Sequence, residues 1–180
     1  MSIGHLNNLW DLLRSEADGH SLLSGEDLIR QKVAHVVMMG GDYPAGKEHN
    51  FFARGSDAVT AEVVHAWPTP ILFSGYTLGL GVMTGRGLVA LPEGHPVRRA
   101  YELHPTHPME RGRPSWDQTA VIAAVRGSGC FWGVSEPGFN RIAVDGSNVW
   151  ESRTDGSHVY LIERDPPAQV AAEIERLMMA

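Results

Sequence analysis

The stretch VAHVVMMGG (residues 33–41) indicates the fold class of this chain. Its first seven residues are almost continuously apolar, which is typical of a strand buried on both faces of a parallel sheet. The stretch ends in Gly40-Gly41, where the lack of side chains lets the backbone turn sharply or approach a ligand. We therefore expect a buried strand over residues 33–39, followed by a tight turn or a ligand-facing loop.

A helix and a second strand follow this loop in the order of a βαβ unit. Residues 56–66 place three valines on one helical face, with Ser56 as the expected cap. Residues 70–73 form a short apolar strand after a proline-containing turn. Right-handed crossovers put the loop after the first strand at the carboxyl edge of the sheet, where such folds bind ligands. We therefore expect that loop to face a ligand crevice.

The remaining segments complete one α/β unit over residues 1–180. Further helices are expected over residues 7–17, 25–31, 96–103, 115–125 and 167–178. From Cys130 onward the pattern changes to short strands, ending with one at residues 159–162. The expected fold class is α/β: an open, mostly parallel sheet flanked by helices, with short antiparallel strands near the carboxyl terminus.

Composition and charge exclude several function classes. The chain is 43% hydrophobic and 20% charged, which is ordinary for a globular protein. Its net charge is −6 with scattered Lys and Arg, so nucleic acid is not expected as a partner. We find neither a signal peptide nor an apolar run long enough for a membrane span. With a single cysteine, Cys130, and no disulfide framework, we expect the cytoplasm and no membrane partner.

Polar residues gather in the loop after the first strand. Glu48 and Asn50 are two residues apart, so both side chains can point into one crevice. Glu offers hydrogen-bond acceptors, whereas Asn offers a donor and an acceptor, and together they suit the hydroxyls of a sugar. The alternative is a solvated turn, which the spacing alone favours.

A second polar group, RPSWDQTA, occupies residues 113–120 and opens a helix. Ser115 is the expected cap, and the helix dipole favours an acid such as Asp117 in the first turn. Asp117 is alternatively a hard oxygen ligand for Ca²⁺, which requires further carboxylates and carbonyls from other segments. His104 and His107 have a metal-binding spacing, although the prolines around them favour a mobile loop.

The first polar group resembles part of the inosine–uridine-preferring nucleoside hydrolases. Residues 39–58 contain Met-Gly-Gly, Glu-His-Asn-Phe and Asp-Ala in the order of the family's MGG…EFN…DPEA stretch. In that family the Glu and Asn bind ribose, so the resemblance implies that Glu48 and Asn50 do so here. Asp42 lies where family members often have an Asn that contacts the same sugar.

The second polar group resembles the family's late HD motif, which opens a helix. The Asp of that motif ligates the catalytic Ca²⁺, so the resemblance implies a metal-binding role for Asp117. The family's His, implicated in protonating the leaving base, is replaced by Trp116. An indole cannot act as that acid, but it can stack on a base. Residues 3–9 and 145–150 also resemble family segments, so the likeness covers nearly the whole chain.

The chain departs from the family by lacking its Asp-rich DTDxGxDDA motif. That motif supplies most Ca²⁺ ligands and the Asp that activates water. Asp117 alone cannot hold an ion that takes roughly six to eight oxygens, and hydrolysis needs a base within reach of the water. The resemblance therefore implies the carboxyl-terminal half of the family fold. It implies Ca²⁺-dependent N-glycosidic hydrolysis of ribonucleosides once a separate amino-terminal-half chain or a homo-oligomer completes the site.

Two other interpretations remain open at this point. The chain is alternatively a non-catalytic ribose- or nucleoside-binding or interaction module, which Trp116 and the absent Asp motif favour. It is otherwise a truncated product without a selected function. An open half-sheet exposes an edge strand and apolar faces, which favours oligomerisation.

Overall fold

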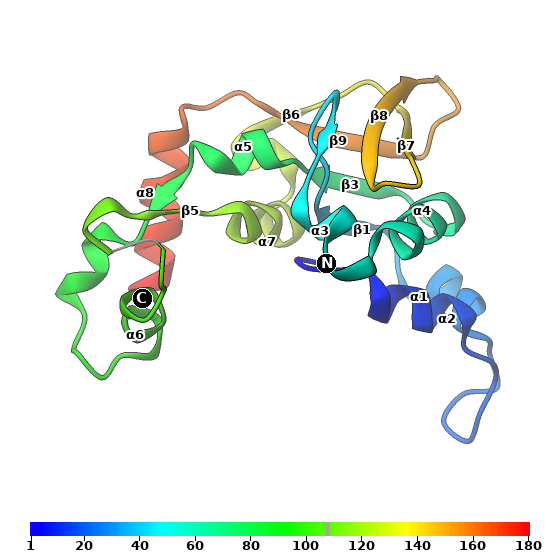
Figure 1. Cartoon of the computed structure of the whole chain (residues 1–180), viewed down its shortest axis with the longest axis horizontal. Helices are drawn as coiled ribbons and strands as arrows, with labels where there is room; N and C mark the ends of the chain where they lie inside the picture. Colours follow the sequence, from blue (N-terminus) through cyan, green and yellow to red (C-terminus); the bar gives the residue numbers. More distant parts are fainter. Residues whose placement is uncertain (107–108) are drawn as a thin grey trace.

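In the computed structural model of the chain, residues 1–106 and 109–180 are described. The helices are α1 (Asn7–Arg14), α2 (Gly25–Lys32), α3 (His49–Phe52), α4 (Asp57–Ala66), α5 (Tyr76–Leu80), α6 (Pro96–Glu102), α7 (Trp116–Arg126) and α8 (Pro167–Met178). The strands are β1 (Val36–Met39), β2 (Ala45–Lys47), β3 (Ile71–Ser74), β4 (Met83–Thr84), β5 (Arg113–Pro114), β6 (Trp132–Val134), β7 (Gly138–Ile142), β8 (Ser147–Ser152) and β9 (His158–Glu163). Figure 1 shows their arrangement, with α6 and α8 on one side of the sheet and α1 and α2 on the other.

The main sheet is open, with a parallel centre and antiparallel strands beside it. Its strand order is β1-β3-β9-β7-β8-β2, and β6 also pairs with β9. β1 and β9 run parallel to β3 on either side, with Ile71 of β3 opposite both Val36 and His158. β6 and β7 pair antiparallel with β9, while β7 and β2 pair antiparallel with β8. The fold class expected from the sequence is therefore confirmed.

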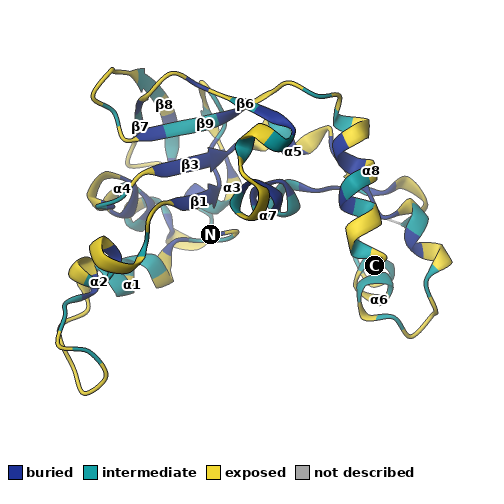
Figure 2. Ribbon diagram, turned by 180° about the vertical axis from the view of Figure 1, so that it is seen from behind, coloured by how far each residue is buried: buried dark blue, intermediate teal, exposed yellow. Residues whose placement is uncertain are grey.

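Helices cover both faces of the parallel strands, which explains the almost continuous apolar run of β1. Val37 and Met39 pack in one core cluster with residues of α7 and α8. Val36 and Met38 pack in a second cluster with residues of α2 and α4. Figure 2 shows β1 and β3 as buried strands between these helices. Successive side chains of a strand point to opposite faces, so each face requires its own apolar residues.

The expected βαβ unit is present as β1, α4 and β3. The turn after β1 depends on two glycines. A Cβ atom on Gly40 would lie 2.2 Å from the ring of Phe51, and Gly41 has a φ of +73°. The missing side chains thus let α3 pack against the end of β1, and the loop carrying Glu48 stays at the carboxyl edge of the sheet.

The structure corrects three local expectations. β1 begins at Val36 rather than at residue 33, because Val33 ends α2 and donates its N–H to the carbonyl of Ile29. Ser56 and Ser115 precede α4 and α7 without capping them through their side chains. Both hydroxyls instead join separate segments, as described below.

Strand β1 forms one edge of the sheet. In the described part of the chain, its outer side carries one parallel bridge, from Ser2 to Met38. Ser2 donates its N–H to the carbonyl of Val37 (2.8 Å) and accepts from the N–H of Met39 (2.9 Å).

Within the described residues, no helix is long and apolar enough to cross a membrane.

Candidate functional site

A pocket of about 230 Å³ opens at the carboxyl ends of β1 and β3. Its lining combines carboxylates, an amide, aromatic rings and a guanidinium, contributed by Ile3, Met39, Glu48, His49, Asn50, Tyr76, Arg113, Trp116 and Asp117. The pocket therefore brings together Glu48 and Asn50 from the loop after β1 with Trp116 and Asp117 from the start of α7. These are four of the five residues singled out in the sequence, and Asp42 is not among the lining residues.

Glu48 is held at the start of α3 and is only 5% exposed. One of its carboxylate oxygens accepts the backbone N–H of Asn50 at 3.0 Å. Burial raises the pKa of Glu48 to about 7, backbone N–H groups of Asn50 and Gly41 lower it, and the negative charges of Asp117 and Asp42 add to the rise. Near neutral pH the carboxyl group is thus divided between its acid and its carboxylate form.

The side chain of Asn50 is fixed through its amide nitrogen. Nδ2 donates to the carbonyl of Met39 at 3.3 Å. The backbone carbonyl of Asn50 accepts from the Ser56 hydroxyl at 3.1 Å, and the ring nitrogen Nδ1 of His5 lies 3.1 Å from it. Ser56 thus secures the loop after β1 instead of capping α4 through its side chain. The amide oxygen of Asn50 has no hydrogen-bond partner among the described residues and is left as an acceptor beside the pocket.

Asp117 lies in the first turn of α7 and is half-buried. Burial raises its pKa, and the positive charge of Arg113 opposes that rise. Within the described part of the chain, the Asp117 carboxylate makes neither a hydrogen bond nor an ion pair. The helix dipole accounts for an acid at this position, yet the carboxylate also faces the pocket with its oxygens available.

Trp116 forms an aromatic pair with Tyr76. Their ring centroids are 5.4 Å apart and the rings are inclined by only 18°. The indole Nε1 donates to the carbonyl of Tyr76 at 3.0 Å, which fixes the orientation of the ring. The approach depends on Gly79, because a Cβ atom there would lie 2.6 Å from the indole. Both rings line the pocket and present a flat apolar surface to it.

Asp42 is engaged elsewhere. Its carboxylate accepts the backbone N–H and the hydroxyl of Thr77, each at 3.0 Å. It also accepts the N–H of Tyr43 at 3.2 Å. Asp42 lines a neighbouring pocket together with Tyr43 and Thr77. Its present role is therefore to tie the loop after β1 to α5.

The described residues of the pocket do not by themselves complete the Ca²⁺ site that the resemblance implies. Only Glu48 and Asp117 supply carboxylates to it, and Arg113 places a positive charge beside them. Throughout residues 1–106 and 109–180, no three His, Cys, Asp or Glu side chains are grouped so as to hold a metal ion. The His104–His107 spacing falls partly outside the described residues, because His107 is not among them.

A second pocket of about 200 Å³ adjoins the first. The two share Arg113, Trp116 and Asp117, and the second adds Tyr101, His104 and Gln118. The Tyr101 hydroxyl accepts from the Gln118 amide at 3.3 Å and pairs with the Thr84 hydroxyl at 3.0 Å. Thr84 in turn pairs with the Ser115 hydroxyl at 2.6 Å. The buried Ser115 hydroxyl thus supports the lining residue Tyr101 through Thr84.

Sequence reasoning missed Tyr76 and Arg113 as lining residues. Tyr76 begins α5 in a glycine-rich segment whose pattern indicated no element, and only its position directly after β3 could have drawn attention to it. Arg113 was noted only as the start of the second polar group.

No protein-family model and no curated protein matches this sequence.

Proposed function

We propose that this pocket binds the ribose of a ribonucleoside and that the chain is one half of a nucleoside hydrolase-like protein. The supporting observation is the convergence of Glu48 and Asn50 with Trp116 and Asp117 on one pocket. The two pairs lie far apart in the sequence, and each was singled out by its own motif.

The polar groups of the pocket suit sugar hydroxyls. Glu48 and the amide oxygen of Asn50 are acceptors, and each ribose hydroxyl donates one hydrogen bond. Because Met39 and Ser56 already fix the position of Asn50, little side-chain entropy is lost when the sugar binds. Hydroxyls that donate to Glu48 stabilise its carboxylate form, so ribose binding is expected to lower the pKa of Glu48.

The aromatic pair and the adjoining pocket suit the base. We call the pocket that contains Glu48 and Asn50 the ribose pocket. A base stacked on Trp116 would extend from it into the adjoining pocket, where the Tyr101 hydroxyl and the Gln118 amide can hydrogen bond to the edge of the base. Neither pocket alone reaches the roughly 300 Å³ typical of small-molecule sites, but the two together exceed it. The shared wall thus favours a ligand made of two parts, a sugar and a heterocycle.

Hydrolysis of the N-glycosidic bond is proposed only for a completed site. This chain would contribute Asp117 as one oxygen ligand for Ca²⁺, and a second chain carrying an Asp-rich motif would contribute the other ligands and the catalytic base. The edge of β1 supports such a partner, because among the described residues its outer side pairs only with Ser2, and the strand ends at the pocket residue Met39. A second copy of this chain is the alternative occupant.

A non-catalytic ribonucleoside-binding module is the second candidate function. Trp116 in place of an acid and the lack of a metal-ligand group among the described residues favour it. Binding that is equally strong with and without Ca²⁺, without turnover, would support this module. Ca²⁺-dependent hydrolysis after addition of the partner chain would support the first proposal.

The shared claim of ribose binding is tested by replacing Asn50. Titration calorimetry of the Asn50→Ala variant with a ribonucleoside should show about tenfold weaker binding than the unaltered chain, since one hydrogen bond to a polar ligand is lost. Asn7→Ala is the matched control, because Asn7 is exposed on α1. Equal affinities of the two variants would contradict the proposal.

A further inference from the structure

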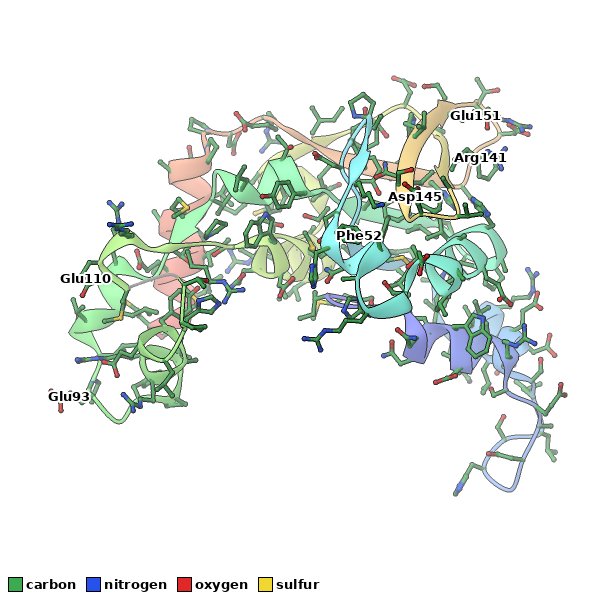
Figure 3. The ribbon with its side chains drawn as sticks, viewed as in Figure 1. Phe52, Glu93, Glu110, Arg141, Asp145 and Glu151 are labelled. Atoms are coloured by element: carbon green, nitrogen blue, oxygen red, sulfur yellow. The ribbon has the colours of Figure 1, made fainter. Side chains whose placement is uncertain are left out.

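Another polar pocket, separate from the two adjoining pockets described above, lies at the opposite end of the parallel strands. It has a volume of about 200 Å³ and is lined by His65, Phe139, Arg141, Arg153 and His158. His158 begins β9 and pairs in register with Ile71, the first residue of β3. The pocket is therefore at the amino ends of these strands, away from the ribose pocket. Figure 3 shows Arg141 and Glu151 beside one another on the β7–β8 hairpin.

His158 presents a hydrogen-bond donor to this pocket. The residue is only 3% exposed, and its Nδ1 accepts the backbone N–H of Asn140 at 3.0 Å. A ring nitrogen that accepts a hydrogen bond carries no proton, so the proton of the neutral imidazole is on Nε2. No described residue accepts a hydrogen bond from Nε2, which leaves this donor for a ligand.

The two arginines are oriented by carboxylates that occupy only part of each guanidinium. Glu151 accepts from Nε of Arg141, and the terminal nitrogens of Arg141 have no partner among the described residues. Asp155 accepts from Nε and one terminal nitrogen of Arg153 at 3.0 and 2.8 Å. The other terminal nitrogen of Arg153 lies 3.7 Å from Glu151, beyond hydrogen-bond distance. Donors of both side chains therefore remain available.

The aromatic ring of Phe139 holds these guanidinium groups in place. The guanidinium carbons of Arg141 and Arg153 lie 5.5 and 5.4 Å from its centroid. Such cation–π contacts restrict the motion of both arginines and favour a fixed spacing of their donors. Both arginine side chains remain partly exposed (50% and 44%), and these contacts orient their N–H donors at the pocket.

Glu151 and Asp155 formally balance the two arginines, yet the charge of Arg141 acts on both imidazoles of the pocket. Burial lowers the pKa of His158 to about 4, and the charges of His65 and Arg141 add to the decrease. Burial likewise lowers the pKa of His65, with Arg141 again contributing.

We propose that this pocket binds a phosphoryl group. Donors converge on it from Arg141, Arg153 and His158, and a phosphoryl group presents three or more acceptor oxygens to such a set. A carboxylate has only two oxygens in one plane, so one oxygen would have to accept from two of these three side chains, whereas a phosphoryl group offers each of them an oxygen of its own. The site is independent of the ribose pocket and is not needed for the function proposed above.

The test is a titration of the chain with inorganic phosphate near neutral pH, followed through the NMR resonances of the His158 imidazole. We expect saturable shifts and a rise in the His158 pKa, because a bound anion stabilises the imidazolium. Sodium chloride at the same ionic strength should have little effect. Shifts of the same size with chloride would show that only screening occurs and would overturn the proposal.

Two variants tie the binding to this pocket. Arg141→Gln and Arg153→Gln should each weaken phosphate binding about tenfold or more, since each removes a charge-assisted donor. Arg30→Gln is the matched control, because Arg30 is an exposed arginine with one acidic partner on α2. Equal phosphate affinity of all three variants would overturn the proposal.

Glycerol 3-phosphate distinguishes a site for free phosphate from a site for a phosphoryl group that is part of a larger ligand. If it binds as tightly as inorganic phosphate, the site recognises the phosphoryl group alone. If it binds more tightly, the phosphoryl group belongs to a larger ligand. Both results support the site, whereas failure of both ligands to shift His158 would contradict it.

Discussion

Glu48 and Asp117 face the same pocket from two different elements, and the negative charge of Asp117 contributes to the raised pKa of Glu48. One carboxylate caps α3 after the first strand, and the other begins α7. Burial is the larger cause of the shift, and the like charge adds to it. Perturbed carboxylates in a crevice are typical of functional sites.

Replacing Asp117 should therefore change the titration of Glu48. In the Asp117→Asn variant the pKa of Glu48 should fall, because one repulsive charge is removed while burial remains. The side-chain carboxyl resonance of Glu48 in a pH titration by NMR reports this value. Asp11→Asn, on the exposed face of α1, is the control. An unchanged Glu48 pKa in the Asp117 variant would show that the two carboxylates do not interact.

Glu48 should make the fold less stable as the pH rises. Its pKa is 4.5 when exposed and about 7 in the folded chain, so between these values only the unfolded chain has lost the proton. The free energy of unfolding therefore decreases from about pH 4.5 to about pH 7, by roughly 3 kcal/mol for this shift. Glu48→Gln should remove this decrease, and urea unfolding at several pH values measures it. Identical pH profiles of both chains would contradict the assignment.

Trp116 should matter for the base and not for the sugar. The Trp116→Ala variant is expected to bind a ribonucleoside about tenfold more weakly, in line with the loss of one stacked base. Its affinity for free ribose should stay within about twofold of the unaltered chain. Titration calorimetry with both ligands measures the ratio. A parallel loss of ribose and nucleoside binding would show that Trp116 supports the whole pocket instead of stacking on the base.

Gly40 should not tolerate a side chain. A methyl group there would lie 2.2 Å from the ring of Phe51, which is fully buried and cannot move freely. Gly40→Ala should therefore lower the free energy of unfolding by about 1–3 kcal/mol or more. Gly4→Ala is the control, because no atom lies within 4 Å of a Cβ at that position. Thermal or urea unfolding of the two variants decides the point, and equal stabilities would rule out the close contact.

Local patterns were sufficient to predict the fold class and most helices. The amphipathic pattern of residues 167–178 gives α8 with the same bounds, and the apolar run after residue 33 gives β1 after a short extension of α2. Both elements depend on side chains near one another in the sequence. The same is true of the turn at Gly40 and Gly41, whose small size has a direct local consequence.

The features that the sequence did not predict depend on contacts between distant segments. Strand β2 is short and exposed, and it exists because residues 45–47 pair with β8. The Ser56 hydroxyl donates to the carbonyl of Asn50, and the Ser115 hydroxyl pairs with that of Thr84. Neither side chain therefore caps a helix. Asp42 was assigned to the sugar by its position in the motif, but Thr77 holds its carboxylate.

The proposal that this pocket binds ribose is tested most directly by calorimetric titration of the chain. The ligands are inosine, uridine and their 2′-deoxy counterparts, each with and without Ca²⁺. We expect the ribonucleosides to bind at least about tenfold more tightly than the 2′-deoxynucleosides, because the latter lack a hydroxyl that donates to Glu48 or Asn50. We also expect Ca²⁺ to have little effect on binding by the isolated chain. Equal affinity for both sugars, or no binding of either, would contradict a ribose site in this pocket.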